Sequence, residues 1–197
     1  MTPARLCIPA LLLLCACSFL DPREDPTRFF VLSPVAEPGA AAGADPGLLI
    51  ALGPVHVPDY LLRPELVRRA GPNQLEPSRV DRWAEPVDRA LVRVLCLDLG
   101  ALLPQSSVVP FPAGDKPGLE LEIDLAAFEA DAKGTARLRA RWHVRGAEPR
   151  VVRECKLERE AESSETPAVV AAMSALLADL AACIAAELGA GGAPAAR

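Results

Sequence analysis

Residues 119–144 read LELEIDLAAFEADAKGTARLRARWHV, and the two-residue period of this stretch decides how the chain folds. Its first half alternates Leu or Ile with acidic residues, and its second half alternates apolar residues with arginines or His143. Successive side chains of a strand point to opposite faces, so each half has one apolar and one charged face. Residues 131–134, with sequence DAKG, connect the halves. The pattern predicts an antiparallel hairpin with acids beside arginines, and a one-residue slip would expose an apolar face.

Further strands are expected on both sides of this hairpin in the chain. Turn residues at 70–73 predict a second, short hairpin, and residues 33–47, rich in Ala, Pro and Gly, predict a flexible loop. The expected additional strands lie at 27–32, 48–57, 65–69 and 74–76, with another beside the main hairpin at Val151, Cys155 and Leu157.

Two helices are predicted by apolar residues spaced three and four apart. The first begins within 82–85 and ends near Leu102, because Pro86 is tolerated only in a first turn. The second begins with Thr166 as N-cap and Pro167 at the first helical position, and it stops at Gly189. The apolar face of the first contains Trp83, Val87, Leu91, Val94 and Leu95; that of the second contains Val169 or Val170, Met173, Leu177, Leu180, Ile184 and Leu188.

These elements predict one α/β domain over residues 17–189, followed by a disordered tail at 190–197. The expected architecture is a mixed, mostly antiparallel sheet of five to six strands with two main amphipathic helices packed on it. Hydrophobic residues make up 51% of the chain and aromatic residues 4%, so the core is expected to consist mainly of Leu, Val and Ala.

The N-terminus has the layout of a secretory signal. Arg5 is followed by an apolar run, and Leu14, Cys15 and Ala16 precede Cys17. A basic start, an apolar middle and small residues are typical of a cleaved signal peptide, here residues 1–16. The order resembles the lipoprotein type of signal, in which the cysteine receives a thioether diacylglycerol and an N-acyl chain. The alternative is an uncleaved anchor helix, but the uncharged run has 15 residues, whereas a membrane span needs ~20.

Charge and cysteine content narrow the class of protein further. The formal charge is −5 and no basic stripe is interleaved with aromatic residues, which argues against nucleic acid as a partner.

Cys96, Cys155 and Cys183 remain after Cys17 is acylated. Cys96 and Cys183 lie in apolar surroundings typical of small core residues. An exported compartment also permits a disulfide between two of the three thiols, so both interpretations stay open.

Motifs for catalysis are absent from the sequence. It contains no G-x-S-x-G, no phosphate-binding glycine loop, and two histidines without a ligand-spaced partner. Glu120, Glu122 and Asp124 could serve acid–base chemistry, but the predicted hairpin places arginines beside them, which favours a salt-linked surface. We therefore expect no enzyme activity, no metal and no cofactor.

One segment combines exposed aromatic and basic residues near a helix start. It runs from Gly53 to Arg69 and continues over residues 78–87. Aromatic and Arg side chains dominate interface anchors, which favours a partner-binding surface. Packing of the aromatics and pairing of the arginines with Asp59, Glu65 or Asp81 is the equally weighted alternative. The candidate partner-binding residues are Tyr60, Arg63, Arg69, Arg82 and Trp83.

The same segment resembles the PqiC (paraquat-inducible protein C) lipoproteins, which are ABC-type transport auxiliary components. The residues that carry the resemblance are Pro58, Tyr60, Leu61, Arg63, Pro64, Val67, Arg69, Arg82, Trp83, Ala84, Glu85 and Pro86. The resemblance implies a three-layer fold like the anticodon-binding and TolB N-terminal architectures. It also implies a non-catalytic role in phospholipid transport between membranes, docking an MCE (mammalian cell entry) domain protein or a neighbouring copy in a homo-oligomer. Ser18, rather than Asp, after Cys17 favours the periplasmic face of the outer membrane.

Two other functions remain open at the level of sequence. One is an accessory lipoprotein of another envelope assembly, such as lipopolysaccharide insertion or peptidoglycan synthase activation. The other is a hydrolase acting on envelope material, which would need a cleft with a cluster of perturbed titratable groups.

Lipid attachment predicts the outcome of removing its acceptor. Changing Cys17 to Ala should release the protein from the membrane fraction, because each buried methylene of the acyl chains contributes about 0.8 kcal/mol to membrane binding. Fractionation followed by immunoblotting measures this. Full retention of the variant in the membrane fraction would contradict the anchor.

Overall fold

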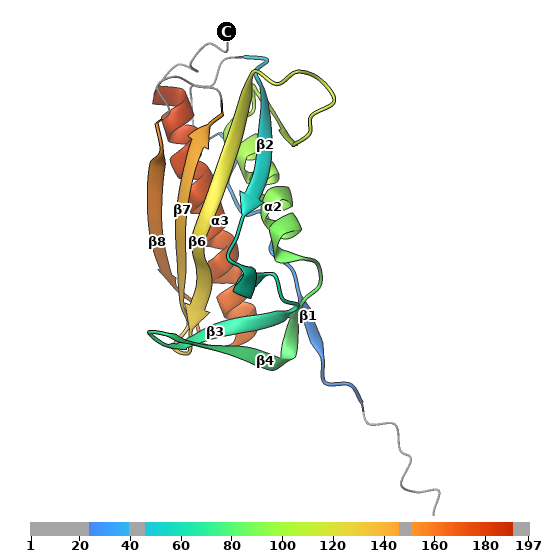
Figure 1. Ribbon diagram of the computed structural model, residues 1–197, viewed down its shortest axis with the longest axis vertical. Coiled ribbons are helices and arrows are strands. Elements are labelled where there is room, and N and C mark those ends of the chain that lie inside the picture. The colour runs from blue at the N-terminus through green and yellow to red at the C-terminus, as the bar shows by residue number, and fades with distance from the viewer. Residues whose placement is uncertain (1–23, 40–45, 146–150, 191–197) are drawn as a thin grey trace, which may run out of the picture.

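The hairpin predicted at 119–144 is present and forms the centre of the sheet (Figure 1). The computed structural model describes residues 24–39, 46–145 and 151–190. The predicted signal peptide, Cys17 and residues 191–197 of the predicted tail lie outside this part of the chain. The elements are β1 (Arg28–Phe30), β2 (Leu49–His56), the 3-10 turn η2 (Asp59–Leu61), β3 (Glu65–Gly71), β4 (Gln74–Trp83), α2 (Val87–Leu102), β5 (Ser107–Pro110), β6 (Leu119–Asp131), β7 (Thr135–Val144), β8 (Arg153–Glu160) and α3 (Thr166–Ala190).

A β-bulge keeps the long hairpin in register where the sequence period breaks. Before the bulge, Leu125 pairs with Ala140, and after it Phe128 pairs with Leu138, with the register shift between Leu125 and Ala127. An extra residue in one strand changes which positions point inward. Phe128 is therefore buried, and the even-numbered apolar residues after the bulge join the odd-numbered ones before it in a single core.

β6 organises the whole sheet because it pairs along both edges. β2 runs parallel to its first half, β3 runs parallel to its last residues, and β7 lies antiparallel on the other edge, followed by β8. The expected mixed α/β sheet is confirmed, and the sheet is open. The described residues form eight strands rather than five to six, in part because the four-residue β5 joins β2. Four of the seven pairings between described strands are parallel, more than the mostly antiparallel sheet expected.

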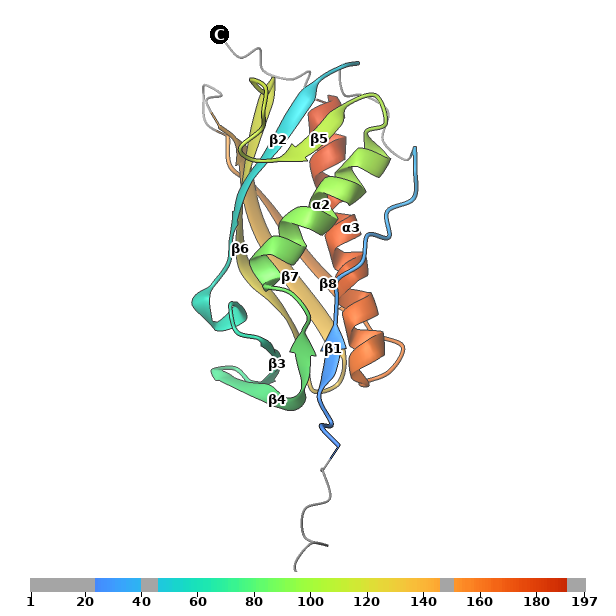
Figure 2. The ribbon, with the colours of Figure 1, turned by 90° about the vertical axis from the view of Figure 1, so that its right-hand side faces the viewer.

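Both helices cover the same face of the sheet (Figure 2). α3 packs on β6, β7 and β8, while α2 packs on β2, β5 and α3. Charged side chains such as Arg139, Arg141 and Asp124 are exposed on the strands that the helices cover from the other side. A sheet face with charges in water needs no covering layer. The described domain thus has two layers, not the three that the family resemblance implied.

The start of α2 differs from the prediction. Trp83 is the last residue of β4 rather than part of the helix, and its N–H donates to the Pro64 carbonyl at 2.8 Å. The N-cap of α2 is Pro86, whose backbone is extended, with φ −55° and ψ 130°. A proline disfavours helical backbone in the residue before it, so the helix cannot extend back through Glu85.

α3 is long and apolar enough to cross a membrane by length and composition alone. Residues 166–189 have a mean hydropathy of 2.2 over their most apolar window, yet 61% of that window is buried inside the fold. Leu176, Leu177 and Ile184 are fully buried. α3 is therefore the core helix of this domain, and it ends at Ala190, one residue beyond the predicted stop.

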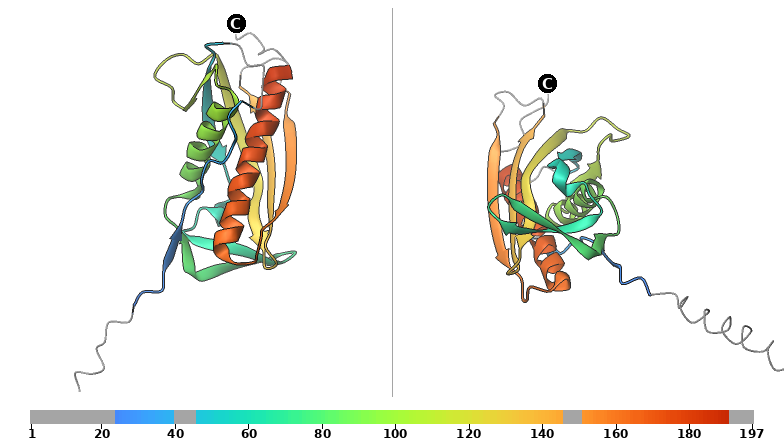
Figure 3. Two further views of the ribbon diagram at one scale, coloured as in Figure 1. Left: turned by 180° about the vertical axis from the view of Figure 1, so that it is seen from behind. Right: turned by 60° about the horizontal axis from the view of Figure 1, so that its bottom comes forward.

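The described part of the predicted flexible loop is tied to α2 (Figure 3). The N–H groups of Val35 and Ala36 donate to Asp98 Oδ1, each at 2.9 Å, and Gly39 N–H donates to the Ala101 carbonyl at 3.2 Å. Asp98 is fully buried on α2. Residues 40–45 of the loop lie outside the described residues.

Burial raises the pKa of Asp98, although the two backbone hydrogen bonds oppose this. A group whose pKa is raised on folding stabilises the protein below its unfolded pKa and loses that contribution as pH rises through its folded pKa. Asp98→Asn keeps an oxygen acceptor without a charge. We expect the variant to be more stable than wild type at neutral pH and equal to it near pH 3, measured by urea unfolding across pH.

Asp98→Ala provides the contrast, because it leaves two N–H groups without their acceptor. It should lose about 1–3 kcal/mol of unfolding free energy. If Asp98→Asn is as destabilised as Asp98→Ala at neutral pH, the buried charge is not a cost to folding.

Candidate docking surface

The five candidate residues come from η2, the turn after it, β3 and β4, and Figure 2 shows β1, β3 and β4 together at one end of the molecule. Tyr60 comes from η2, Arg63 from the turn after it, Arg69 from β3, and Arg82 and Trp83 from the end of β4. The fold brings them to one end because β3 and β4 form a hairpin attached to the last residues of β6. Their side chains nevertheless occupy three separate environments.

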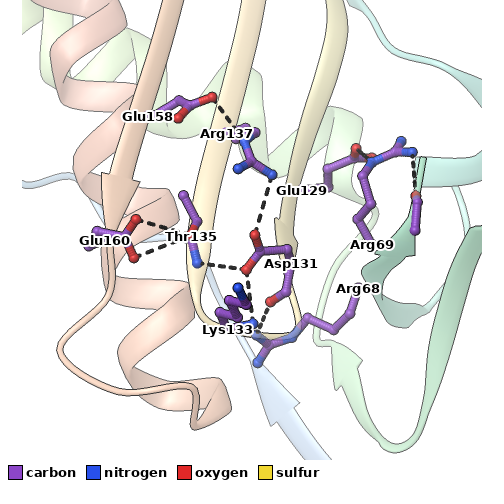
Figure 4. A network of polar contacts seen from close by, with 10 residues as sticks. Arg68, Arg69, Glu129, Asp131, Lys133, Thr135, Arg137, Glu158 and Glu160 are labelled. Atoms are coloured by element: carbon purple, nitrogen blue, oxygen red, sulfur yellow. Dashed lines mark hydrogen bonds and ion pairs between the residues drawn. The ribbon is translucent and has the colours of Figure 1, made fainter.

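Tyr60 and Arg69 converge on Glu129, a carboxylate whose side chain is only 5% exposed. The Tyr60 hydroxyl donates to Glu129 Oε2 at 2.8 Å. Arg69 Nε donates to Glu129 Oε1, and Figure 4 shows this pair. Burial, reinforced by Glu129, raises the pKa of Tyr60 to about 12. Arg69 also donates to the Pro72 carbonyl at 2.9 Å. These two residues join η2, β3 and β6, so they hold the hairpin in place.

Trp83 belongs to the core and not to the surface. It is 9% exposed and packs in the same cluster as Leu32 and Leu91. Its backbone hydrogen bond to Pro64 closes the base of the β3–β4 hairpin. A contribution of Trp83 to docking would therefore be indirect.

Arg63 and Arg82 are the candidates that remain accessible. Both face Glu65, with Arg63 Nε at 3.2 Å and Arg82 Nη2 at 3.6 Å, and their side chains are 49% and 42% exposed. Exposed ion pairs contribute about 0–1 kcal/mol, so these arginines can exchange Glu65 for another carboxylate at little cost. With the exposed Arg79 they line a hollow of about 720 Å³, to which Glu65 and Glu76 also contribute. We call Arg63, Arg79 and Arg82 the arginine patch.

A second hollow, largely apolar, lies between α2, β2 and β5. It measures about 580 Å³, and Val92, Cys96, Leu97 and Val108 contribute to its lining. Leu97 is 52% exposed. Asp88, Arg89 and Arg93 also line it, so polar side chains border the apolar surface.

Asp81 holds this end of the molecule together. From the sequence alone, Asp81 is only one of three possible ion-pair partners of the arginines. It accepts from Arg28 Nε at 2.7 Å and from the Thr166 hydroxyl at 2.6 Å. Burial works to raise the pKa of Asp81, but these two hydrogen bonds outweigh it and the pKa is lowered. Asp81 thus connects β1, β4 and the first residue of α3. Only the tertiary structure brings these three together.

Glu120 and Glu122 of the main hairpin are salt-linked, as the sequence predicted, while Asp124 is exposed on the same strand. Arg145 lies 3.3 Å from Glu120 and 3.4 Å from Glu122, and His143 lies 3.5 Å from Glu122. Over residues 24–39, 46–145 and 151–190, no group of three or more His, Cys, Asp or Glu side chains is arranged to hold a metal ion.

A family model decides the class of protein. The model for the ABC-type transport auxiliary lipoprotein component matches residues 30–185. The chain belongs to this family. The match confirms the family resemblance seen in the segment around Tyr60 and Arg63, and it covers β1 through most of α3. As an auxiliary lipoprotein of an ABC-type transport system, the protein is assigned to the cell envelope and to a machine with other components.

Solved structures show that this auxiliary lipoprotein shares its fold with proteins of low sequence identity. A crystal structure of an uncharacterized protein has a TM-score of 0.70 and 22% identity, and the match covers 82% of this chain and 98% of that one. Protein XCC0632 from Xanthomonas campestris, of the DUF330 family, has a TM-score of 0.69 and 18% identity, covering 84% and 97%. No curated protein matches the chain.

The three environments predict different costs of substitution. Arg69→Ala should destabilise the auxiliary lipoprotein by about 3 kcal/mol, because it leaves the buried Glu129 charge with one donor fewer. Tyr60→Phe should cost about 1 kcal/mol, and Arg63→Ala less than about 0.5 kcal/mol. Urea unfolding of the three variants measures this. Equal losses for Arg63→Ala and Arg69→Ala would contradict the separation of structural from accessible arginines.

Proposed function

We propose that the protein is the lipid-anchored auxiliary component of an intermembrane phospholipid transport system, and that it docks an MCE-domain partner at the periplasmic face of the outer membrane. The observation that carries the proposal is the family match over residues 30–185, joined to the lipoprotein-type signal before Cys17. The transport system supplies the energy and moves the lipid. This chain contributes a tether and a binding surface.

The position of the arginine patch fits a docking role beside the membrane. β1 lies parallel to β4, so the N-terminal end of the described chain leaves the domain next to the hairpin that carries Arg82 (Figure 1). Glu24 is the first described residue, and Cys17 precedes it by seven positions. Seven residues span at most about 25 Å. A tether of this length keeps the patch close to the membrane surface.

The chemistry of the patch indicates an acidic partner surface. Arg63 and Arg82 share a single carboxylate, Glu65, and Arg79 is exposed beside them. Guanidinium groups bind carboxylates through parallel hydrogen bonds, which adds specificity to charge attraction. The exposed Leu62, 51% accessible, lies next to Arg63 in the chain and supplies apolar contact area. Charged rims around an apolar contact are typical of protein interfaces.

A charge-reversal experiment tests this role. Arg63→Glu combined with Arg79→Glu should reduce recovery of an MCE-domain partner at least tenfold, because like charges then meet across the interface. Affinity purification of the full chain from detergent-solubilised membranes, with quantitative mass spectrometry, measures it. The matched control is Arg139→Glu with Arg141→Glu, which makes the same charge change on exposed positions of β7.

The result separates the competing functions. Recovery should be unchanged in the control pair, and both doubly substituted proteins should keep the wild-type melting temperature. Undiminished recovery by the Arg63 and Arg79 variant would remove the patch from the interface. Recovery of lipopolysaccharide-insertion or peptidoglycan-synthase proteins in place of an MCE-domain protein would overturn the assignment in favour of another envelope assembly.

A further inference from the structure

Two cysteines from distant parts of the chain meet between the edge strand and the core helix. Cys155 lies on β8 and Cys183 on α3, and the Cys155 thiol donates a hydrogen bond to Cys183 Sγ at 2.9 Å. Cys155 is buried and Cys183 is half-buried. Neither residue belongs to the arginine patch, and neither lines the apolar hollow.

Ion pairs flank the two cysteines on both sides. Arg159 binds Asp179 at 2.7 Å, and Arg153 binds Glu187 at 2.6 Å. Asp179, Cys183 and Glu187 are spaced by four residues, so they lie along one side of α3. Their partners on β8 follow in the opposite order. The contact between the two thiols is therefore the middle one of three successive side-chain contacts between β8 and α3.

We propose that Cys155 and Cys183 form a disulfide bond once the protein has been exported. The sulfur atoms of a disulfide are about 2.05 Å apart, so the pair must close by roughly 0.9 Å, which side-chain rotation can supply. Disulfides form and persist in the oxidising envelope, to which the lipoprotein family assigns this chain. Cys96, on α2, stays as a thiol.

The bond forms by thiol–disulfide exchange with an exported oxidoreductase that carries a disulfide. One cysteine thiolate attacks that disulfide, the second cysteine displaces the mixed disulfide, and the oxidoreductase leaves with both electrons and protons as a dithiol. Burial, together with Cys183, raises the pKa of Cys155 to about 12 in the folded domain. Because the thiolate is the attacking form, exchange takes place while the chain is still folding and both thiols are accessible.

The consequence of the bond is an edge strand fastened to the core. Among the strands that the structure describes, β8 pairs with β7 alone, so one of its edges carries no described neighbour. A cross-link from residue 155 to residue 183 closes a loop of moderate length and limits the unfolded chain. It also keeps β8 from separating from the sheet. The unpaired edge of β8 is thereby protected from pairing with other chains.

Alkylation of the full chain purified from membranes tests the proposal. Without reductant, in denaturant, Cys96 should be modified and Cys155 and Cys183 protected; after reduction all three should be modified. Tryptic mapping should recover the peptide with Cys155 joined to the peptide with Cys183. Quantitative alkylation of Cys155 and Cys183 in unreduced protein would overturn the proposal, and so would a bond from either to Cys96.

Thermal unfolding provides a second readout with a matched control. Reduction should lower the melting temperature of wild type by about 10 °C, and Cys96→Ala should show the same difference. Cys183→Ala should show none, because it has no bond to lose. An equal response to reductant in Cys183→Ala and Cys96→Ala would contradict the assignment even if Cys183→Ala were less stable overall.

Discussion

The structure depends on β6 keeping one apolar face along thirteen residues while it pairs with three other strands. A strict two-residue period would turn Phe128 and Ala130 outward after Leu125, because side chains alternate along a strand. The bulge before Ala127 corrects this and lets β7 continue in register. α3 can then cover β6, β7 and β8 as one surface, and β3 can attach its hairpin to the last residues of β6. The position of the docking end of the molecule follows from that attachment.

Three buried carboxylates hold the parts of the fold that surround this core. Asp98 ties the chain after β1 to α2, Asp81 joins β1, β4 and α3, and Glu129 joins η2 and β3 to β6. A buried charge is costly unless it is hydrogen-bonded, and each of these accepts at least two hydrogen bonds. Both bonds to Asp98 go to Oδ1, and within the described residues its Oδ2 has no partner, so the Asp98 charge still carries a cost. Arg69 and Arg28 bind the other two carboxylates, whereas Arg63, Arg79 and Arg82 stay accessible at the end of the molecule formed by β3 and β4. In a chain of net charge −5, the candidate docking surface therefore consists of the arginines that stay accessible, as distinct from those that bind buried carboxylates.

The candidate site was only partly predictable from the sequence. The segment from Gly53 to Arg69 identified the family, since its residues match a pattern along the chain. It could not distinguish Arg69 from Arg63, because the difference is the carboxylate each meets. Glu129 lies sixty residues from Arg69 and is buried only because β3 runs beside the end of β6. Likewise, the three late cysteines gave no indication of which two would meet.

The sequence by itself determined the alternating hairpin at 119–144, the long C-terminal helix that begins at Thr166 and the mixed α/β class. It also predicts the lipoprotein-type signal. These are local patterns. The hydrophobic period, the positions of prolines and the order of charged residues each depend on a few neighbouring residues. Only the tertiary structure decided that Trp83 ends a strand, that both helices share one face, and that β5 completes the sheet. It alone placed Cys155 against Cys183 and three carboxylates in the interior. Such contacts join residues far apart in the chain, and packing rather than local preference selects them.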